Sequence, residues 1–392
     1  MANFRRRDFI TTSAAAGVAG VLGSRSVAAA TAPGQSPPPR GYPGSASYAA
    51  TGAQRPWSSP QRPGPAMSID MHTHWAPEGY LKAKAELGQP DFLDPINHDM
   101  ARRKKLMESL GIKTSLLTLG GFRPWVWVTA EQGARISSSA NDSAIEAHAA
   151  YPDSFIAGIE LNCSDPAGSL AELNRVAGKP GLVCVHLPTS LAGRDFMFEP
   201  AFAPVLARTQ ELGLPILLHP LDGEANWFAG HRLADASSGF DPTAANAAAN
   251  RFPGLTNSLG NSLEMAVAIS KLIVTGTLDK YPDITFLATH GGGAIPYVAG
   301  RLEGRGGGGK AKLPVHAYLR RFYYDSATYY VPSLRYLAEM VGADRIVLGT
   351  DNMYGPGDNQ MANQPHALID QSFNDEDRDL VLRGNLKRLL KI

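Results

Sequence analysis

Two histidines, His72 and His74, stand two residues apart in the stretch MSIDMHTHWAPEG. Side chains at positions i and i+2 of a β-strand point to the same face, so both imidazoles would leave one strand on one side. Imidazole nitrogen is a common ligand of divalent metals, and two rings side by side predict part of a metal site. A lone His-x-His is a weak signal, so the interpretation depends on where other residues of this kind fall.

Further residues of this kind follow short apolar runs. His219 ends LPILLH, His290 ends ITFLATH, and Asp351 ends RIVLGTD. Three histidines and one aspartate would bind one divalent ion and leave room for a water: His72, His74, His219 and Asp351. His290 would act as a base or acid beside that water, because histidine titrates near neutral pH, and Asp351 is the second candidate for moving a proton. The three glycines after His290 would let a substrate approach the backbone closely.

The remaining candidates have other interpretations. Asp325, near the end of FYYDSA, fits a helix N-cap or a salt bridge as well as a place in the site. His186, inside GLVCVHL, is expected to be a buried structural histidine and not a ligand. Cys163 and Cys184 cannot form a disulfide framework and are expected to be small buried apolar residues. The other histidines are expected on the surface or around the ligands: His98, His148, His231, His316 and His366.

A site assembled from strand ends needs a scaffold that brings those ends together. From Met67 onward, short apolar runs alternate with helix-like stretches, which is typical of buried parallel strands. Eight such strands close a β/α barrel, whose chemistry lies at the C-terminal strand ends. We therefore predict a single-domain (β/α)8 TIM-like barrel over 67–392. A doubly wound open sheet is the alternative, but no Gly-x-Gly-x-x-Gly follows the first run. The expected strands are 68–72, 113–119, 154–161, 181–187, 214–219, 284–290, 322–327 and 345–351.

The beginning of the chain has a different composition. Residues 1–31 contain Arg5, Arg6 and Arg7, then a short apolar run, then SVAAATA, and together these resemble a twin-arginine signal peptide. We expect a periplasmic or secreted protein with no stable membrane span after cleavage, because the run is short and rich in Gly and Ala. Residues 32–66 are rich in Pro, Gly and Ser and are expected to form an extended linker.

The overall composition narrows the class of partner. The chain has 392 residues, of which 44% are hydrophobic and 19% charged, and its formal net charge is +1. No basic excess is present of the kind that nucleic acid or a lipid surface would attract. We expect a small-molecule substrate and no nucleic-acid partner, and a homodimer is left open.

The order of the motifs resembles a known superfamily. Asp70-x-His72-x-His74, then LLHP, then THGGG, then GTD is similar to the amidohydrolase superfamily. More narrowly, it resembles the aminocarboxymuconate-semialdehyde decarboxylase branch of amidohydrolase-related proteins. The resemblance runs from about Ser68 to RGNLKRLL, and its most specific stretch is TGTLDKYPDITFLATHGGGAIPYVAGRL.

The resemblance implies a barrel that holds one zinc or manganese ion. The ligand positions match His72, His74, His219 and Asp351, and His290 matches the histidine that activates a metal-bound water or hands on a proton. Binuclear members of the superfamily use a lysine in the fourth strand, and GLVCVHL contains none. The resemblance is therefore to the mononuclear members.

The activity that the resemblance implies is the non-oxidative loss of CO2 from an aromatic or unsaturated acid. We expect a metal-dependent decarboxylase of a small carboxylic acid of this kind. The alternative is a metal-dependent hydrolase of a lactone or amide, since some relatives hydrolyse these bonds with the same residues. A non-catalytic periplasmic protein that binds metal or aromatic compounds is a further alternative, but such a protein would need no His290 beside its ligands.

Two departures from the branch concern the pocket walls. In the decarboxylase that gives the branch its name, an arginine between the first two strands grips a substrate carboxylate. No arginine occurs here between His74 and Arg102, and Arg123 or Arg251 could substitute. Asn352 stands where the branch usually has an aromatic residue. The resemblance is therefore expected to predict the metal chemistry of this chain better than its substrate.

Overall fold

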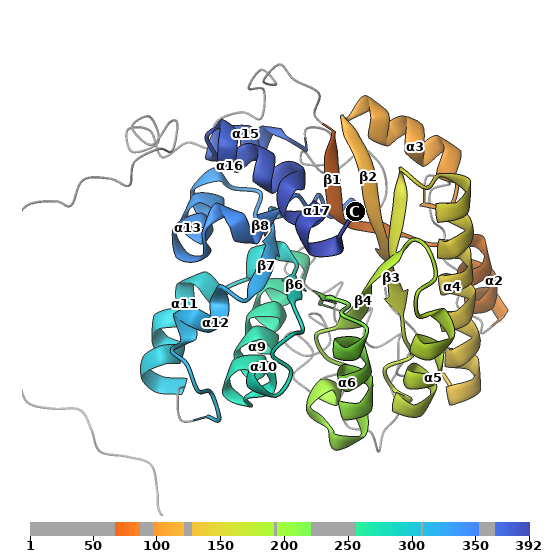
Figure 1. The fold of residues 1–392 in the computed structure, drawn as a ribbon, viewed down its shortest axis with the longest axis horizontal. Helices are drawn as coiled ribbons and strands as arrows, with labels where there is room; N and C mark the ends of the chain where they lie inside the picture. The colour runs from red at the N-terminus through yellow and green to blue at the C-terminus, as the bar shows by residue number, and fades with distance from the viewer. Residues whose placement is uncertain are drawn as a thin grey trace, which may run out of the picture. The chain divides into compact units, whose positions relative to one another are not determined.

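Eight parallel strands form one sheet whose order follows the sequence from β1 to β8 (Figure 1). The computed structural model describes residues 67–86, 97–120, 128–191, 194–220, 256–306, 309–352 and 365–392. Every predicted strand is present at its expected place, although β1 is longer than predicted and β3, β5, β6, β7 and β8 are shorter. The strands are β1 (Ser68–Trp75), β2 (Ile112–Leu119), β3 (Phe155–Glu160), β4 (Leu182–Pro188), β5 (Ile216–His219), β6 (Phe286–Ala288), β7 (Phe322–Asp325) and β8 (Ile346–Val347).

Backbone hydrogen bonds join the last strand to the first. The N–H of Met71 on β1 donates to the carbonyl of Leu348 at 3.0 Å, and the N–H of Asp351 donates to the carbonyl of His72 at 2.8 Å. The chain after β8 therefore runs beside β1, and the sheet closes into a barrel. This confirms the predicted (β/α)8 barrel, and the open sheet is wrong because it would leave β1 and β8 apart.

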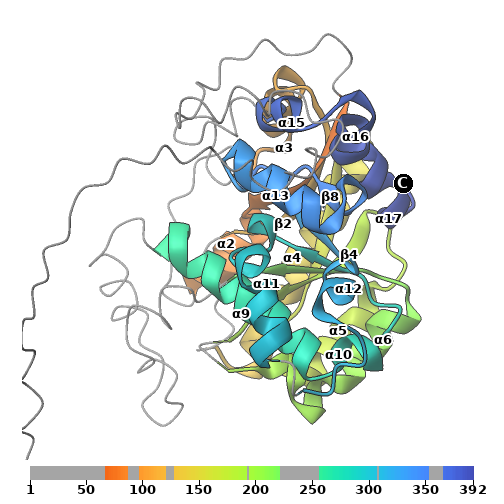
Figure 2. The same ribbon diagram turned by 90° about the vertical axis from the view of Figure 1, so that its left-hand side faces the viewer.

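Helices follow the strands and surround the barrel (Figures 1 and 2). The α-helices are α2 (Glu78–Glu86), α3 (Met100–Ser109), α4 (Ala130–Ala150), α5 (Pro166–Val176), α6 (Ala203–Glu211), α9 (Asn261–Val274), α10 (Thr277–Lys280), α11 (Ile295–Arg301), α12 (Val315–Leu319), α13 (Val331–Val341), α15 (Ala367–Ser372), α16 (Asp375–Asp379) and α17 (Asn385–Leu390). Single 3₁₀ or π turns connect several of them: η3 (Phe196–Phe198), η4 (Pro200–Phe202), η6 (Thr256–Gly260), η7 (His290–Gly292), η8 (Leu302–Gly306), η9 (Ala343–Arg345) and η10 (Leu380–Gly384).

Local sequence signals fix where several helices begin. Thr129 caps α4: its side chain accepts a hydrogen bond from the N–H of Gln132, whose side chain accepts from the N–H of Thr129 in return. This reciprocal capping box satisfies two backbone donors that the first helical turn leaves free. Asp165 caps α5, and Pro166 occupies its first position, where a missing N–H has no cost.

The inside of the barrel has two levels. The N-terminal half is filled with apolar side chains, and α17 adds two leucines that close this end. The interior cluster consists of Ile69, Met71, Leu116, Ile156, Cys184, Leu217, Leu287, Tyr323, Val347, Leu386 and Leu390. The C-terminal half instead carries the histidines and carboxylates predicted from the strand ends, which is where barrels of this type place their chemistry.

The remaining predictions about organisation have mixed outcomes. Cys163 and Cys184 are both buried and are not joined by a disulfide, as predicted. The described residues all belong to one compact unit, Gly41–Ile392. The predicted signal peptide and linker, 1–31 and 32–66, lie outside the described residues, so both stay predictions. Among the helices that the structure describes, none has the length and apolar character needed to span a bilayer.

A candidate metal centre at the C-terminal end of the barrel

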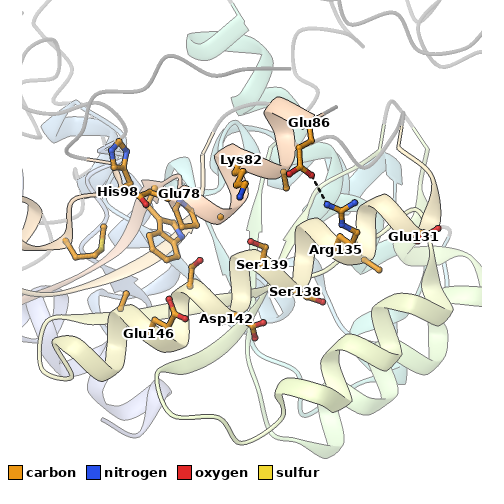
Figure 3. A pocket seen from close by; sticks show the side chains of 18 residues that line it. Glu78, Lys82, Glu86, His98, Glu131, Arg135, Ser138, Ser139, Asp142 and Glu146 are labelled. Carbon is orange, nitrogen blue, oxygen red and sulfur yellow. Dashed lines mark hydrogen bonds and ion pairs between the residues drawn. The ribbon is translucent and has the colours of Figure 1, made fainter. Parts of the chain in front are cut away.

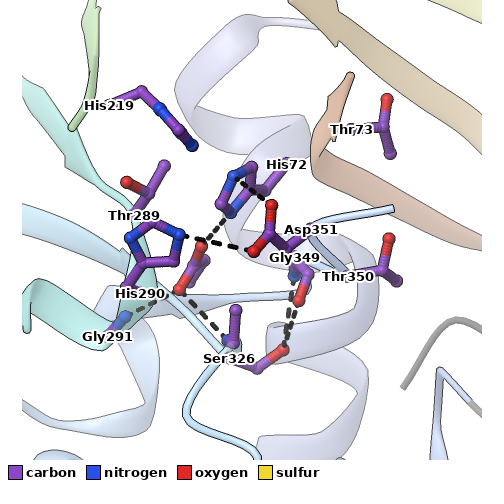
Figure 4. A network of polar contacts seen from close by, with 12 residues as sticks. His72, Thr73, His219, Thr289, His290, Gly291, Ser326, Gly349, Thr350 and Asp351 are labelled. Atoms are coloured by element: carbon purple, nitrogen blue, oxygen red, sulfur yellow. Dashed lines mark hydrogen bonds and ion pairs between the residues drawn. The ribbon is translucent and has the colours of Figure 1, made fainter. Parts of the chain in front are cut away.

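The four predicted ligands converge on one point. Figure 4 shows three of them, His72, His219 and Asp351. His72 and His74 leave β1, His219 ends β5, and Asp351 follows β8. Each offers one ligand atom, and these atoms all lie within 4.8 Å of one another. The Nε2 atoms of His72 and His74 are 3.2 Å apart, and each is 3.3 Å from Oδ1 of Asp351. Two imidazoles, a carboxylate oxygen and a third imidazole therefore face a shared space.

An irregularity in β1 lets both of its histidines face the interior. Ile69 and Met71 already point inward with the apolar cluster, so strict alternation would turn the next residue outward. The pairing of β1 with β2 shifts between Asp70 and Thr73, and this bulge changes the phase of the alternation. His72 consequently reaches the site although it directly follows Met71.

A buried carboxylate fixes the protonation of His72. Nδ1 of His72 lies 2.5 Å from Oδ2 of Asp325, and both side chains are fully buried. The other oxygen of Asp325 accepts from the N–H of Gly291 at 2.7 Å and of Ala327 at 3.1 Å. An acceptor of this kind places the His72 proton on Nδ1 and leaves the Nε2 lone pair for a ligand. Asp325 is thus an ion-pair partner, one of the alternatives left open for it.

Hydroxyl and carbonyl groups impose the same tautomer on the other two histidines. Thr118 Oγ1 donates its proton to the carbonyl of Thr73, so it can only accept from Nδ1 of His74, 3.2 Å away. Nδ1 of His219 lies 2.5 Å from the carbonyl of Pro220, which has no proton to give. In each ring Nδ1 therefore faces an acceptor, and Nε2 is the atom directed at the shared space.

This donor set fits a divalent cation. The Nε2 atom of His219 is buried and has no hydrogen-bond partner among the described residues. A buried acceptor without a donor is costly, and a cation bound between the ligands would relieve that cost. Three imidazole nitrogens and one carboxylate oxygen are ligands that Zn²⁺ and related ions accept, with an open position for a further ligand. The residues present therefore fit the implied metal.

The electrostatics of the site favour positive charge between these groups. Burial raises the pKa of Asp351, but His72, His290 and His74 outweigh this and hold it well below its usual range. Burial, with the neighbouring His74 and His72, lowers the pKa of His219 well below its usual value. Burial lowers the pKa of His72, but Asp351 and Asp325 raise it on balance to about 8. An ionised Asp351 and a neutral His219 are the states that metal binding requires.

Asp70, the first residue of the Asp-x-His-x-His motif, is a structural partner and lies outside the ligand set. Its Oδ2 accepts from the hydroxyl of Thr350 at 2.6 Å, and its Oδ1 accepts from the backbone N–H groups of Thr350 and His72 at 3.1 Å each. Burial raises the pKa of Asp70 to about 6. The contacts join β1 to the segment that carries Asp351, so Asp70 holds two ligand-bearing strands together.

His290 stands beside the four ligands and contacts one of them. Its Nε2 lies 3.4 Å from Oδ2 of Asp351, whereas the nearest carboxylate atom to His72 and His74 is Oδ1. The backbone of His290 is left-handed, with φ 54°, so the chain turns sharply after β6 and aims the ring at Asp351 (Figure 4). This places His290 within ion-pair distance of Asp351, although its Nε2 forms no hydrogen bond with the described residues.

Two of the three glycines after His290, Gly291 and Gly293, serve packing. A Cβ on Gly293 would lie 2.0 Å from the carbonyl oxygen of Ser262 on α9, and one on Gly291 would lie 2.5 Å from Cγ2 of Thr328. The expectation that these glycines leave room for a substrate is therefore wrong for both positions, because protein atoms fill the space.

Other predicted residues lie apart from the ligand set. His186 is fully buried, with Nδ1 2.6 Å from Oε1 of Glu160, and the 6.3 Å between the centres of its ring and the His219 ring makes it a neighbour. This agrees with a structural histidine. His366 was expected on the surface or around the ligands, but it is buried near the start of β1, where its Nε2 lies 2.8 Å from Oγ of Ser68. The loop residues Arg123 and Arg251 lie outside the described residues.

Sequence reasoning missed three side chains that support the site. Thr118 orients His74 as described above, and Arg103 of α3 donates from a terminal guanidinium nitrogen to the carbonyl of His74 at 2.7 Å. The hydroxyl of Tyr329 donates to Oδ2 of Asp351 at 3.3 Å. Thr118 is the next-to-last residue of the predicted strand 113–119, which pairs with β1, so its position in the barrel was a usable signal. No pattern in the sequence indicated that Arg103 or Tyr329 would reach a ligand.

A wide groove lies elsewhere, between α2 and α4 (Figure 3). Its volume is about 1080 Å³, and it contains none of the four predicted ligands. Acidic and basic side chains share its walls, and Glu86 and Arg135 pair across it at 2.7 Å. The groove is therefore a polar surface feature, and the chemistry belongs to the barrel end.

Comparisons with known proteins agree with this geometry. A family model described as amidohydrolase matches residues 69–392. The 2-amino-3-carboxymuconate-6-semialdehyde decarboxylase of Dictyostelium discoideum is 20% identical, over 83% of this chain and 92% of that protein. The gamma-resorcylate decarboxylase of a Rhizobium species is 25% identical, over 83% of this chain and 98% of that protein. The crystal structure of a dihydroxybenzoic acid decarboxylase from Polaromonas, with bound manganese and the inhibitor 2-nitroresorcinol, superimposes with a TM-score of 0.66 at 25% identity, covering 83% and 96% of the two chains.

Proposed function

Because the chain belongs to the amidohydrolase family, we propose that it is a metal-dependent carboxy-lyase that removes CO2 from a small aromatic or unsaturated carboxylic acid. The observation that carries this proposal is the placement of His290 against Asp351, beside a donor set that fits a divalent ion. Full-length relatives that decarboxylate resorcylate and aminocarboxymuconate semialdehyde support the reaction type. An aromatic acid is favoured over an aliphatic one, because the structural relative from Polaromonas acts on dihydroxybenzoic acid.

His72, His74, His219 and Asp351 would hold the metal, and we propose Zn²⁺ as its identity. Imidazole-rich sites bind Zn²⁺ more tightly than the harder Mn²⁺, although the manganese in the Polaromonas relative makes Mn²⁺ the alternative. A bound divalent ion would supply a Lewis acid that polarises oxygen atoms of the substrate. Elemental analysis of purified protein distinguishes the two, and we expect about one ion per chain, since four ligands make one site.

The chain's own residues would supply the proton. Decarboxylation breaks the bond between a ring or alkene carbon and its carboxylate, and the electron pair stays on that carbon. A proton must then form the new C–H bond as CO2 leaves. His290 Nε2 and Asp351 Oδ2, 3.4 Å apart, are the groups placed to deliver it, and His290 is the first choice because an imidazole can both accept and donate a proton and His290 is not needed as a metal ligand.

The deciding experiment measures products. Metal-loaded protein is incubated with 2,6-dihydroxybenzoate and other phenolic acids, and CO2 release is followed together with the decarboxylated phenol. The His290→Asn variant should lose this activity, while His316→Asn, a change at an exposed histidine on α12, should keep it. Incorporation of labelled water into a lactone or amide, without CO2, would replace the proposal with the hydrolase alternative. Metal binding without turnover of either class would favour a binding protein.

We also propose that the protein is exported through the twin-arginine route to the periplasm or beyond. The arginines at the start of the chain and the short apolar run after them support this. Changing Arg6 and Arg7 to Lys should leave the protein in the cytoplasm, and unchanged export would contradict the proposal. A homodimer stays a prediction, which sedimentation equilibrium would measure directly.

A further inference from the structure

Left-handed backbone is concentrated at the candidate metal centre. Among the described residues other than glycine, positive φ angles occur at His290 (54°), Tyr329 (54°), Asp351 (55°) and Lys391 (57°). Lys391 is next to the chain end, but the other three belong to one site. Such conformations are strained for residues with a Cβ and persist where the surrounding structure enforces them, often at functional sites.

Tyr329 and His290 both contact the same side-chain oxygen of Asp351. The hydroxyl of Tyr329 donates to Oδ2 of Asp351 at 3.3 Å, and Nε2 of His290 lies 3.4 Å from the same atom. The other oxygen, Oδ1, faces the Nε2 atoms of His72 and His74 at 3.3 Å each. The two oxygens of this carboxylate therefore have different nearest partners: Oδ1 contacts the ligand histidines, and Oδ2 contacts Tyr329 and His290.

The loop between β7 and α13 holds Tyr329 in place. Its ring is half-buried against the hydrophobic core. Earlier in the loop, the methyl group of Thr328 packs against the position of Gly291, and Ser326 Oγ donates to the carbonyl of Gly349. The loop is thus anchored both to the turn that carries His290 and to the segment that carries Asp351.

We propose that Tyr329 is a positioning residue of the metal centre, because its hydroxyl holds Asp351 Oδ2 away from the ion so that only Oδ1 binds. This inference rests on the proposed metal-dependent function. A carboxylate can bind a cation through one oxygen or through both, and a donor on one oxygen favours the single-oxygen mode. Single-oxygen binding by Asp351 keeps a coordination position open for the substrate.

The test replaces Tyr329 with phenylalanine, which keeps the ring and its packing but removes the donor. Wild type and variant are loaded with Co²⁺, whose visible absorption weakens as its coordination number rises. In Tyr329→Phe we expect Oδ2 to join Oδ1 on the ion, so the absorption weakens while the metal stays bound. Turnover should fall by about 10- to 100-fold, the usual cost of losing a group that orients a metal ligand. Tyr330→Phe, a change at the exposed neighbouring tyrosine, should leave both measurements unchanged.

The other possible results distinguish a failure of the positioning role from a failure of the metal-dependent function. A wild-type spectrum in Tyr329→Phe would overturn the positioning role, whether turnover falls or not, and would leave the proposed decarboxylase intact. If the wild-type protein binds no Co²⁺, Zn²⁺ or Mn²⁺, the metal-dependent function fails and this inference fails with it. The melting temperature of Tyr329→Phe should match the wild type, because the backbone conformation and the packing of the half-buried ring against the core are kept.

Discussion

Replacing Asp325 with asparagine should weaken metal binding although Asp325 is itself no ligand. The carboxylate accepts the Nδ1 proton of His72 on one oxygen and the N–H of Gly291 on the other. Asparagine can keep only one of these bonds as an acceptor. If its oxygen stays on Gly291, its NH₂ group faces the Nδ1 proton of His72, and two donors oppose each other. The ring then either loses its partner or moves its proton to Nε2, which blocks the ligand atom.

The size of the effect follows from the burial of the pair. Both side chains are fully buried, and the 2.5 Å separation of His72 Nδ1 and Asp325 Oδ2 marks a charge-assisted hydrogen bond. Such a bond contributes about 1.5–3 kcal/mol. At about 1.4 kcal/mol per tenfold change, its loss weakens metal binding by about 10- to 150-fold. Removing a group that hydrogen-bonds to a metal ligand usually weakens metal binding by about 10- to 100-fold, which agrees with this value.

Competition with a chromogenic chelator measures the metal dissociation constant directly. Asp279→Asn is the matched control, because Asp279 also accepts a short hydrogen bond, from the hydroxyl of Tyr318 at 2.6 Å, but contacts no ligand. The control should keep the wild-type affinity, and thermal melting confirms that both variants fold. An unchanged dissociation constant in Asp325→Asn would refute the claim that this carboxylate sets the tautomer of His72.

Three further outcomes are expected. His290→Asn should retain its metal and lose turnover by about 10²- to 10⁴-fold, the usual contribution of a general acid or base, whereas loss of metal would make His290 a ligand. Gly293→Ala should lower the free energy of unfolding, as measured with urea. Left-handed backbone at a residue with a Cβ costs about 1–3 kcal/mol. The total loss should be larger, because the added methyl would also lie 2.0 Å from the Ser262 carbonyl oxygen. Burial lowers the pKa of His366 from 6.5 to about 4. As the pH falls from about 6.5 to about 4, His366 binds a proton in the unfolded chain but not in the folded protein, so the free energy of unfolding falls. The loss should reach about 3 kcal/mol near pH 4, and it should be absent from the urea curves of His366→Gln.

The fold could be predicted from the sequence because its strands are buried on both faces. A strand buried in this way is a short, nearly continuous apolar run, and each run stood out against its polar helices. The four ligands followed from the same reasoning, since the C-terminal ends of all strands in a closed barrel meet at one mouth. Residues such as His219 and Asp351, far apart in the chain, were placed together by topology alone.

The supporting contacts could not be predicted in the same way. Asp325 lies on a predicted strand, but whether it caps a helix or pairs with His72 depends on which way its side chain points. The bulge in β1, which turns both histidines inward, has no signature in the residue types around it. The role of the glycines after His290 was mistaken because a glycine permits close approach by any atom, and only the structure shows that Ser262 and Thr328 are the atoms that approach.

The elements that carry these supporting groups explain how barrels of this kind can bind different substrates and still keep the same metal site. The partners of the ligand histidines come mainly from the barrel strands: Thr118 on β2 orients His74, and Asp325 on β7 orients His72. A strand position is fixed by the closed hydrogen-bonded sheet, so these contacts are set by the same residues that set the fold. Tyr329 differs, because it reaches Asp351 from a loop. Loops accept changes in length and sequence more readily than strands. The mode in which Asp351 binds the ion can therefore change while the ligand set and the barrel remain the same.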